Sequence, residues 1–193
     1  MKLDIILSGV GGQGILSIAT IIGTAALKNN LYLKQAEVHG MSQRGGDVQS
    51  HLRISDKPIY SDLIPKGKAD MIISVEPMES LRYLPYLNSE GWLITNLNPF
   101  INIPNYPEIE KVESEINNIK NHISIDADKI ASDLGSKRSM NMVVLGAASE
   151  FMPINFEDFE YAIRTIFEKK GADVINKNLE ALKVGKDFSI KNK

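Results

Sequence analysis

The chain has 193 residues, and a single domain of this length buries about 70% of the surface that its unfolded chain exposes. Its 22 basic and 24 acidic residues give a net charge of -2, so it lacks the basic excess typical of a nucleic-acid-binding protein. The absence of cysteine excludes disulfides, thiolate catalysis and cysteine-held iron–sulfur clusters within this chain.

The apolar run at residues 5–7 follows the start of the chain directly, and Gly9 then interrupts it. This run is too short for the core of a signal peptide, and the longest apolar stretches are shorter than a membrane span. We therefore expect a cytoplasmic protein that contacts neither membrane nor nucleic acid.

The first forty residues predict a strand, a glycine turn, a helix and a second strand. The apolar run 5–8 is typical of a buried strand, and the turn 9–14 carries four glycines. From Ile15 apolar residues recur at helical spacing, so we expect a helix that ends near 29–30. Residues 31–38 then indicate the second strand.

Residues 48–54 alternate apolar and polar side chains, which is typical of a half-buried strand. The turn residues 55–58 lead into a second short apolar pair at 59–60. We expect these segments to form a hairpin, which would make the sheet mixed.

The remainder of the chain alternates strands with helices, which favours an α/β sandwich. We expect one domain over residues 1–186 and a frayed tail over 187–193, with residues 96–121 as a loop plus a short exposed element. The further predicted strands are 71–75, 92–95 and 123–125, and the predicted helices are 77–87, 127–134, 140–151, 156–167 and 174–186.

The glycine turn matches a dinucleotide-binding fingerprint. Gly9, Gly11 and Gly14 fit G-x-G-x-x-G, and Glu37 lies near the end of the second predicted strand, where an acidic side chain can hold a ribose hydroxyl. The hairpin and the short chain count against a nicotinamide-dependent dehydrogenase, because such a fold needs regular strand–helix alternation and a substrate domain. The alternative is that the glycines only let the helix pack closely on the strand.

A second glycine-rich stretch at 37–46 sets four polar side chains among glycines. His39 can act as an acid or base near neutral pH, and Arg44 can hold a carboxylate through its fork of donors. In the alternative interpretation, His39 bonds to the local backbone and Arg44 pairs with Glu37 or Asp47. An exposed pair of that kind contributes about 0–1 kcal/mol, which would not explain the surrounding glycines.

Other polar positions are interpreted as structural. His51 lies in the alternating segment and His122 in an irregular polar region, so neither needs a functional explanation. Asn141 is an amide at the start of an otherwise apolar helix, and we treat it as a candidate cap for a neighbouring loop.

The two glycine stretches together resemble the γ-type subunits of 2-oxoacid:ferredoxin oxidoreductases, in particular the β subunits of the indolepyruvate enzymes. The resemblance rests on residues spread over nearly the whole chain. They are Gly9-Val-Gly-Gly-Gln-Gly14, Glu37-Val-His-Gly-Met-Ser-Gln-Arg-Gly-Gly46, Ser50-His-Leu-Arg53, Ala69-Asp70, and Asn141 with Leu145-Gly146.

This resemblance implies a three-layer α/β/α sandwich with a mixed, mostly parallel sheet, and a heteromeric enzyme. In that family a larger partner holds thiamine diphosphate with magnesium and iron–sulfur clusters, coenzyme A takes the acyl group, and ferredoxin takes the electrons. This chain has no cysteine and no Gly-Asp-Gly thiamine signature, so it would need that partner and would hold no metal itself.

The predicted site is therefore a surface shared with the partner and with 2-oxoacid or coenzyme A. His39 and Arg44 are the candidate catalytic residues. The candidate cofactor-contacting residues are Gly9, Gly11, Gly12, Gln13, Gly14, Glu37, Gln43, Gly45 and Gly46. Two alternatives stay open at this point, an autonomous dinucleotide-binding oxidoreductase and a non-catalytic assembly subunit.

Overall fold

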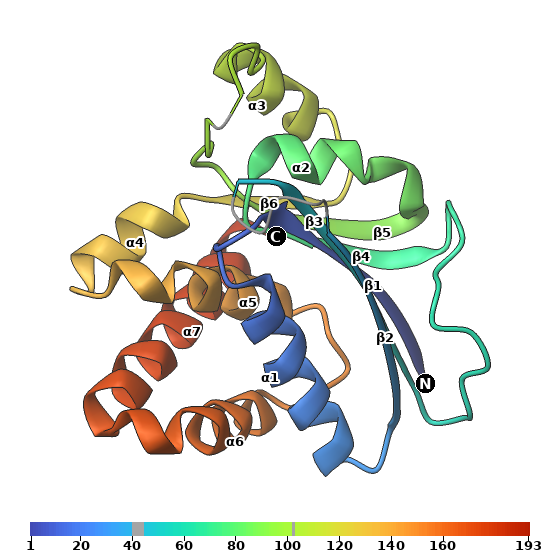
Figure 1. Cartoon of the computed structure of the whole chain (residues 1–193), viewed down its shortest axis with the longest axis vertical. Coiled ribbons are helices and arrows are strands. Elements are labelled where there is room, and N and C mark those ends of the chain that lie inside the picture. The colour runs from blue at the N-terminus through green and yellow to red at the C-terminus, as the bar shows by residue number, and fades with distance from the viewer. Residues whose placement is uncertain (40–44, 102) are drawn as a thin grey trace.

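A computed structural model describes residues 1–39, 45–101 and 103–193. In this part of the chain six strands form one sheet in the order β2-β3-β1-β4-β5-β6 (Figure 1). The pairs β1–β4, β4–β5 and β5–β6 are parallel, whereas β3 runs antiparallel to both β1 and β2. The expected mixed, mostly parallel sheet is confirmed. The strands are β1 Lys2–Val10, β2 Tyr32–His39, β3 Asp47–Ser55, β4 Ala69–Ser74, β5 Leu87–Asn96 and β6 His122–Ile125.

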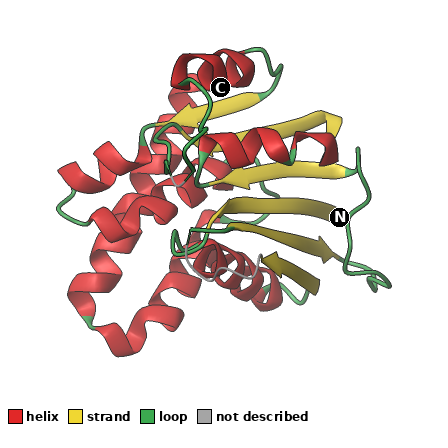
Figure 2. Ribbon diagram, turned by 45° about the horizontal axis from the view of Figure 1, so that its top comes forward, coloured by secondary structure: helices red, strands yellow, loops and turns green. Residues whose placement is uncertain are grey.

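Helices cover both faces of the sheet, so the fold is the expected three-layer sandwich (Figure 2). Alternation along β1 divides the core, since Ile5 and Leu7 point into the larger apolar cluster and Ile6 points into the smaller one. The larger cluster lies under α1 Ile15–Lys28, α4 Ala127–Asp133, α5 Met140–Ser149, α6 Phe156–Phe167 and α7 Ala172–Asn192. The smaller one lies under α2 Pro77–Arg82 and α3 Ile109–Asn117.

The predicted hairpin between 48–54 and 59–60 is wrong, because β3 pairs elsewhere. It lies between β1 and β2, with Ile5 and Gln35 both opposite Leu52. Both edges of β3 are therefore already hydrogen-bonded, and residues 59–60 have no ladder to join. The mixed character of the sheet arises from β3 itself.

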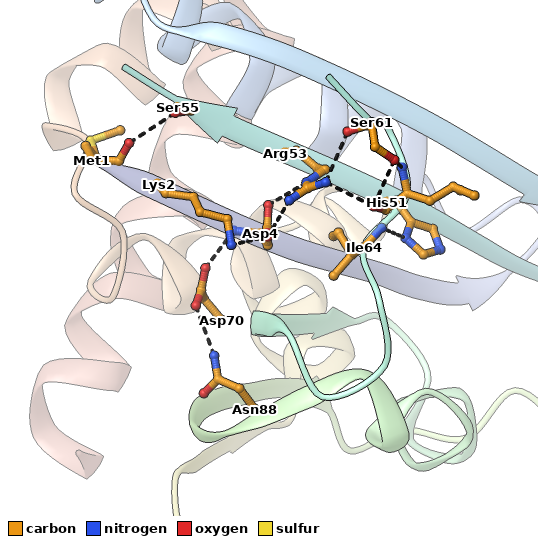
Figure 3. A network of polar contacts seen from close by, with 11 residues as sticks. Met1, Lys2, Asp4, His51, Arg53, Ser55, Ser61, Ile64, Asp70 and Asn88 are labelled. Atoms are coloured by element: carbon orange, nitrogen blue, oxygen red, sulfur yellow. Dashed lines mark hydrogen bonds and ion pairs between the residues drawn. The ribbon is translucent and has the colours of Figure 1, made fainter. Parts of the chain in front are cut away.

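The segment after β3 is instead held on the sheet by two β3 side chains (Figure 3). The Arg53 guanidinium donates to the carbonyl oxygens of Ser61 at 3.1 Å and Leu63 at 3.0 Å, while its other nitrogens donate to buried Asp4. His51 Nδ1 accepts a 2.9 Å hydrogen bond from the Ile64 amide. These contacts give Ser50-His-Leu-Arg53 a structural role, as expected for His51.

Two helix boundaries also differ from the sequence prediction. The helix that begins at Pro77 ends at Arg82, and a short 3₁₀ helix η1 Leu84–Tyr86 leads into β5, because Pro85 cannot continue the helix. The tail expected to fray from residue 187 is helical to Asn192. Ser189 within it is fully buried and donates to the Ala147 carbonyl at 2.9 Å.

Helices α5 and α7 cross backbone to backbone. A Cβ atom added at Gly146 would lie 1.9 Å from the Leu182 oxygen, and one added at Gly185 would lie 2.0 Å from the Val143 oxygen. Only glycine at both positions permits this crossing without a shift of one helix.

Among the described helices, none is both long and apolar enough to cross a bilayer.

Candidate functional site

The two glycine-rich stretches meet at the carboxyl edge of the sheet. Because β1 and β3 are antiparallel neighbours, the end of β1 at Val10 lies opposite the start of β3 at Asp47. The Gly11 amide donates to the Gly46 carbonyl at 2.9 Å, and the Gly45 amide donates to the Gly11 carbonyl at 3.5 Å. We call this contact the glycine junction.

Gln13 braces the turn from within. Its Oε1 accepts from the Val10 amide at 2.8 Å, and its Nε2 donates to the Val75 carbonyl at 3.3 Å. A Cβ atom at Gly9 would lie 2.4 Å from Val75 Cγ2. Gly9 therefore serves close packing on Val75, the residue after β4, and the side chain of Gln13 is engaged inside the turn.

Gly12 and Gly14 differ in their surroundings although both have positive φ, of 104° and 85°. A Cβ atom at Gly12 would meet nothing within 4 Å, so this backbone is open to a ligand. At Gly14 the same atom would lie 2.4 Å from Asn141 Nδ2, and that nitrogen donates to the Gly14 carbonyl at 3.1 Å. Asn141 thus caps the turn, as the sequence suggested.

A cleft of about 780 Å³ opens beside this turn. The glycine turn, the 3₁₀ helix η2 Lys137–Ser139, and residues at the starts of α5 and α7 line it. Neither α1 nor α5 carries an acidic residue in its first turn, so the partial positive charge at these helix starts is not neutralised locally. The start of α7, by contrast, carries Asp173 in its first turn.

The charged side chains lining the cleft are mostly cationic, namely Lys137, Arg138, Lys170 and Lys177 against Asp128 and Asp173. Lys177 pairs with Asp173 at 2.8 Å, and Asp128 accepts from Asn96 at 2.8 Å. Lys137 and Arg138 are exposed and make no ion pair within the described chain. Their charges remain available to a bound anion.

Acidic residues occupy the other side of the glycine junction, beneath α2. Glu76 is fully buried and accepts from the Glu79 amide at 2.8 Å, the Phe100 amide at 3.3 Å and the Tyr106 hydroxyl at 2.5 Å. Burial raises the pKa of Tyr106, and its hydrogen bond to Glu76 raises that pKa further. Glu76 therefore caps α2 and anchors the segment after β5.

Two more carboxylates on this side are also engaged. Burial raises the pKa of Glu79, and the 2.8 Å ion pair with Arg82 partly opposes that rise. The Tyr83 hydroxyl donates to Asp47 at 3.1 Å, and burial followed by the charge of Asp47 raises the pKa of Tyr83. These groups stabilise the fold and leave little capacity for a ligand.

Part of the predicted site lies outside the described residues, namely the side chain of His39 together with Gln43 and Arg44. The backbone of His39 pairs with Val48, and half-buried Glu37 lies opposite Ser50. In the described chain no group of three or more His, Cys, Asp or Glu side chains is arranged to hold a metal ion.

Sequence reasoning missed the cationic cleft. The sequence feature that could have indicated it is the pair Lys137-Arg138 directly before an apolar helix, because this position places cations beside a helix N-terminus. Lys170 and Lys177 come from a different part of the chain, and no local pattern joins them to that pair.

Residues 4–188 match the family of pyruvate ferredoxin/flavodoxin oxidoreductases. The indolepyruvate oxidoreductase subunit IorB of Archaeoglobus fulgidus is 38% identical over 98% of this chain and 96% of its own length. The 2-oxoglutarate synthase subunit KorC of Methanothermobacter marburgensis is 30% identical over 78% of this chain and 77% of its own length.

The fold also has a solved counterpart. It superposes with a TM-score of 0.78 and 23% identity on the 2-oxoglutarate:ferredoxin oxidoreductase of Magnetococcus marinus with 2-oxoglutarate, coenzyme A and succinyl-CoA bound. That match covers 98% of this chain and 31% of the longer enzyme. The chain belongs to the pyruvate ferredoxin/flavodoxin oxidoreductase family.

Proposed function

We propose that this chain is the small subunit of a heteromeric 2-oxoacid:ferredoxin oxidoreductase that converts an aryl pyruvate such as indolepyruvate to its acyl-CoA. The 38% identical relative is named as a subunit of an indolepyruvate oxidoreductase, and it matches this chain nearly end to end. Without cysteine, the chain depends on a larger partner for the iron–sulfur clusters. Thiamine diphosphate and the clusters of that partner would supply the decarboxylation and the transfer of electrons to ferredoxin.

The observation that carries the proposal is the cationic cleft beside the glycine junction. Coenzyme A carries phosphate groups, and phosphates bind best where cations and helix N-termini converge. Lys137, Arg138 and the open backbone at Gly12 provide these features. We therefore assign the cleft to the phosphate end of coenzyme A.

Residues 39–44 directly precede Gly45 and Gly46 of the glycine junction in the sequence, and the remaining roles are proposed there. His39 is the candidate acid or base, and Arg44 is the candidate ligand for the substrate carboxylate. The junction would place both residues against the partner, so that they complete a substrate entrance that neither subunit forms alone.

The test is steady-state kinetics of the complex reconstituted with its larger partner. Replacing both cations in Lys137→Ala/Arg138→Ala should raise KM for coenzyme A about tenfold or more, because a hydrogen bond to a charged group contributes about 1.5–3 kcal/mol. The KM for the 2-oxoacid should change little. Lys111→Ala is the matched control, since Lys111 is an exposed lysine of α3.

The alternative functions give different results. A purely assembly-related subunit would show lower yields of complex in these variants with unchanged turnover per assembled complex. An autonomous dinucleotide enzyme would bind NAD tightly in calorimetry with the isolated chain. Either outcome would replace the proposal.

A further inference from the structure

Asn141 contacts the glycine turn in two ways. It lies in the first turn of α5, is 7% exposed, and donates through Nδ2 to the carbonyl of Gly14, which is 127 positions away in the chain. The same nitrogen lies 2.4 Å from where a Gly14 Cβ would be. The contact therefore requires both the amide at 141 and the glycine at 14.

The oxygen that Asn141 binds is also where α1 begins. The Gly14 carbonyl accepts from the Ser17 amide at 3.0 Å and from the Ile18 amide at 3.3 Å. Gly14 is the N-cap of α1 and offers no side chain to hold that helix end. Asn141 adds a third donor to that carbonyl from outside the helix, and this contact holds the first turn of α1 against α5.

Asn141 itself is fixed by the packing of α5 on α7. Gly146 and Gly185 bring the two backbones into contact, and Ser189 of α7 donates to the Ala147 carbonyl of α5 at 2.9 Å. Because this crossing is buried and closely packed, the backbone of α5 that bears Asn141 is held in place.

We infer that Asn141, which itself borders the cleft, is a positioning residue: it fixes the turn at Gly14 and the first turn of α1, which also line the cleft. It acts through the Gly14 carbonyl. The inference rests on the proposed function, because it assigns to Asn141 an effect on the coenzyme A that the cleft is proposed to hold.

The experiment compares variants in the reconstituted complex. Asn141→Ala should raise KM for coenzyme A about fivefold, as expected for one lost hydrogen bond of about 1 kcal/mol. KM for the 2-oxoacid and kcat at saturating coenzyme A should stay within about twofold of the parent values. Asn141→Leu has nearly the same volume but lacks the donor and adds no charge to the cleft, so it should raise the same KM at least as much.

A double-mutant cycle isolates the contact between the two residues. Gly14→Ala should lower Tm more than Gly135→Ala, because both positions have positive φ but only the Cβ at 14 meets Asn141. In the Asn141→Ala background this excess loss should disappear. Equal Tm losses for Gly14→Ala and Gly135→Ala in the parent chain would contradict the contact.

The failure of this inference can be distinguished from that of the proposed function. If the Lys137/Arg138 variant raises KM for coenzyme A and the Asn141 variants do not, Asn141 is only structural and the inference is overturned. If neither set changes that KM, the assignment of the cleft falls as well. If Asn141→Ala does not fold, the uncharged and nearly isosteric Asn141→Leu decides the outcome alone.

Discussion

The two sides of the glycine junction differ in how their charges are satisfied. On the α2 side, Glu76 receives three donors, Glu79 pairs with Arg82, and Asp47 accepts from Tyr83. On the cleft side, Lys137 and Arg138 border open space and make no ion pair within the described chain. Buried charges with a full set of partners therefore stabilise the fold, whereas unpaired charges around a cleft are the candidates for binding a ligand.

The largest effect should come from the buried carboxylate. Glu76→Ala leaves three donors without an acceptor and should lower the free energy of unfolding by about 3 kcal/mol or more, measured by urea denaturation. Glu76→Gln keeps one acceptor oxygen and should cost less. If the alanine variant lost less than about 1 kcal/mol, the hydrogen bonds of Glu76 would not be important for stability.

Replacing Arg44 tests whether the segment next to the glycine junction contributes to catalysis or only to the fold. Arg44→Ala should lower kcat/KM for the 2-oxoacid about 10- to 100-fold in the reconstituted complex, since a charged hydrogen bond to a carboxylate contributes about 1.5–3 kcal/mol. The circular dichroism spectrum and Tm should stay the same. Arg164→Ala, at an exposed position of α6, is the control, and identical kinetics for the two variants would exclude Arg44 from the site.

His51 should make the free energy of unfolding depend on pH. Burial lowers the pKa of His51 from its ordinary value of 6.5; Asp62 opposes this shift and Arg53 adds to it. The unfolded chain therefore binds the proton more readily, and the free energy of unfolding should fall as pH drops below about 6.5. His51→Gln should flatten this slope between pH 7 and 5. An equally steep slope in the variant would assign it to other groups.

The smallest effect should come from the paired cation of the cleft. Lys177→Ala removes an exposed ion pair with Asp173 four residues earlier and should change stability by only about 0.3–0.5 kcal/mol. Its effect on KM for coenzyme A should be smaller than that of the Lys137/Arg138 variant. If Lys177→Ala raised this KM more than the Lys137/Arg138 variant does, an existing ion pair would not distinguish structural charges from ligand-binding ones.

Local patterns predicted much of the fold. The apolar run to Leu7, the glycine turn and the helical spacing from Ile15 are encoded over short distances, and they form β1 and α1 as expected. The hairpin failed because the partner of β3 depends on where β1 and β2 lie, which the sequence near residue 59 does not contain. The end of α7 was missed because Ser189 is buried by α5, a long-range contact.

The candidate site was likewise predicted only in part. The two glycine stretches follow the first two predicted strands, and Gly11 and Gly46 do contact each other, although β1 and β2 are not neighbours because β3 lies between them. The cleft was not predictable, since Lys137 and Lys170 come from separate elements that only the packing of the helical layer brings together. Asn141 was identified by its type, but its partner Gly14 required the structure.

The reversed direction of β3 has a consequence for how this subunit can evolve. Because β3 is antiparallel to β2, β2 ends and β3 begins at one edge of the sheet, where His39 lies opposite Val48. Residues 40–46 therefore join adjacent strand ends, and none of the described backbone pairs between β2 and β3 involves any of them. Substitutions at 40–44 can therefore accumulate without loss of the six-stranded sheet or of the Gly11–Gly46 contact.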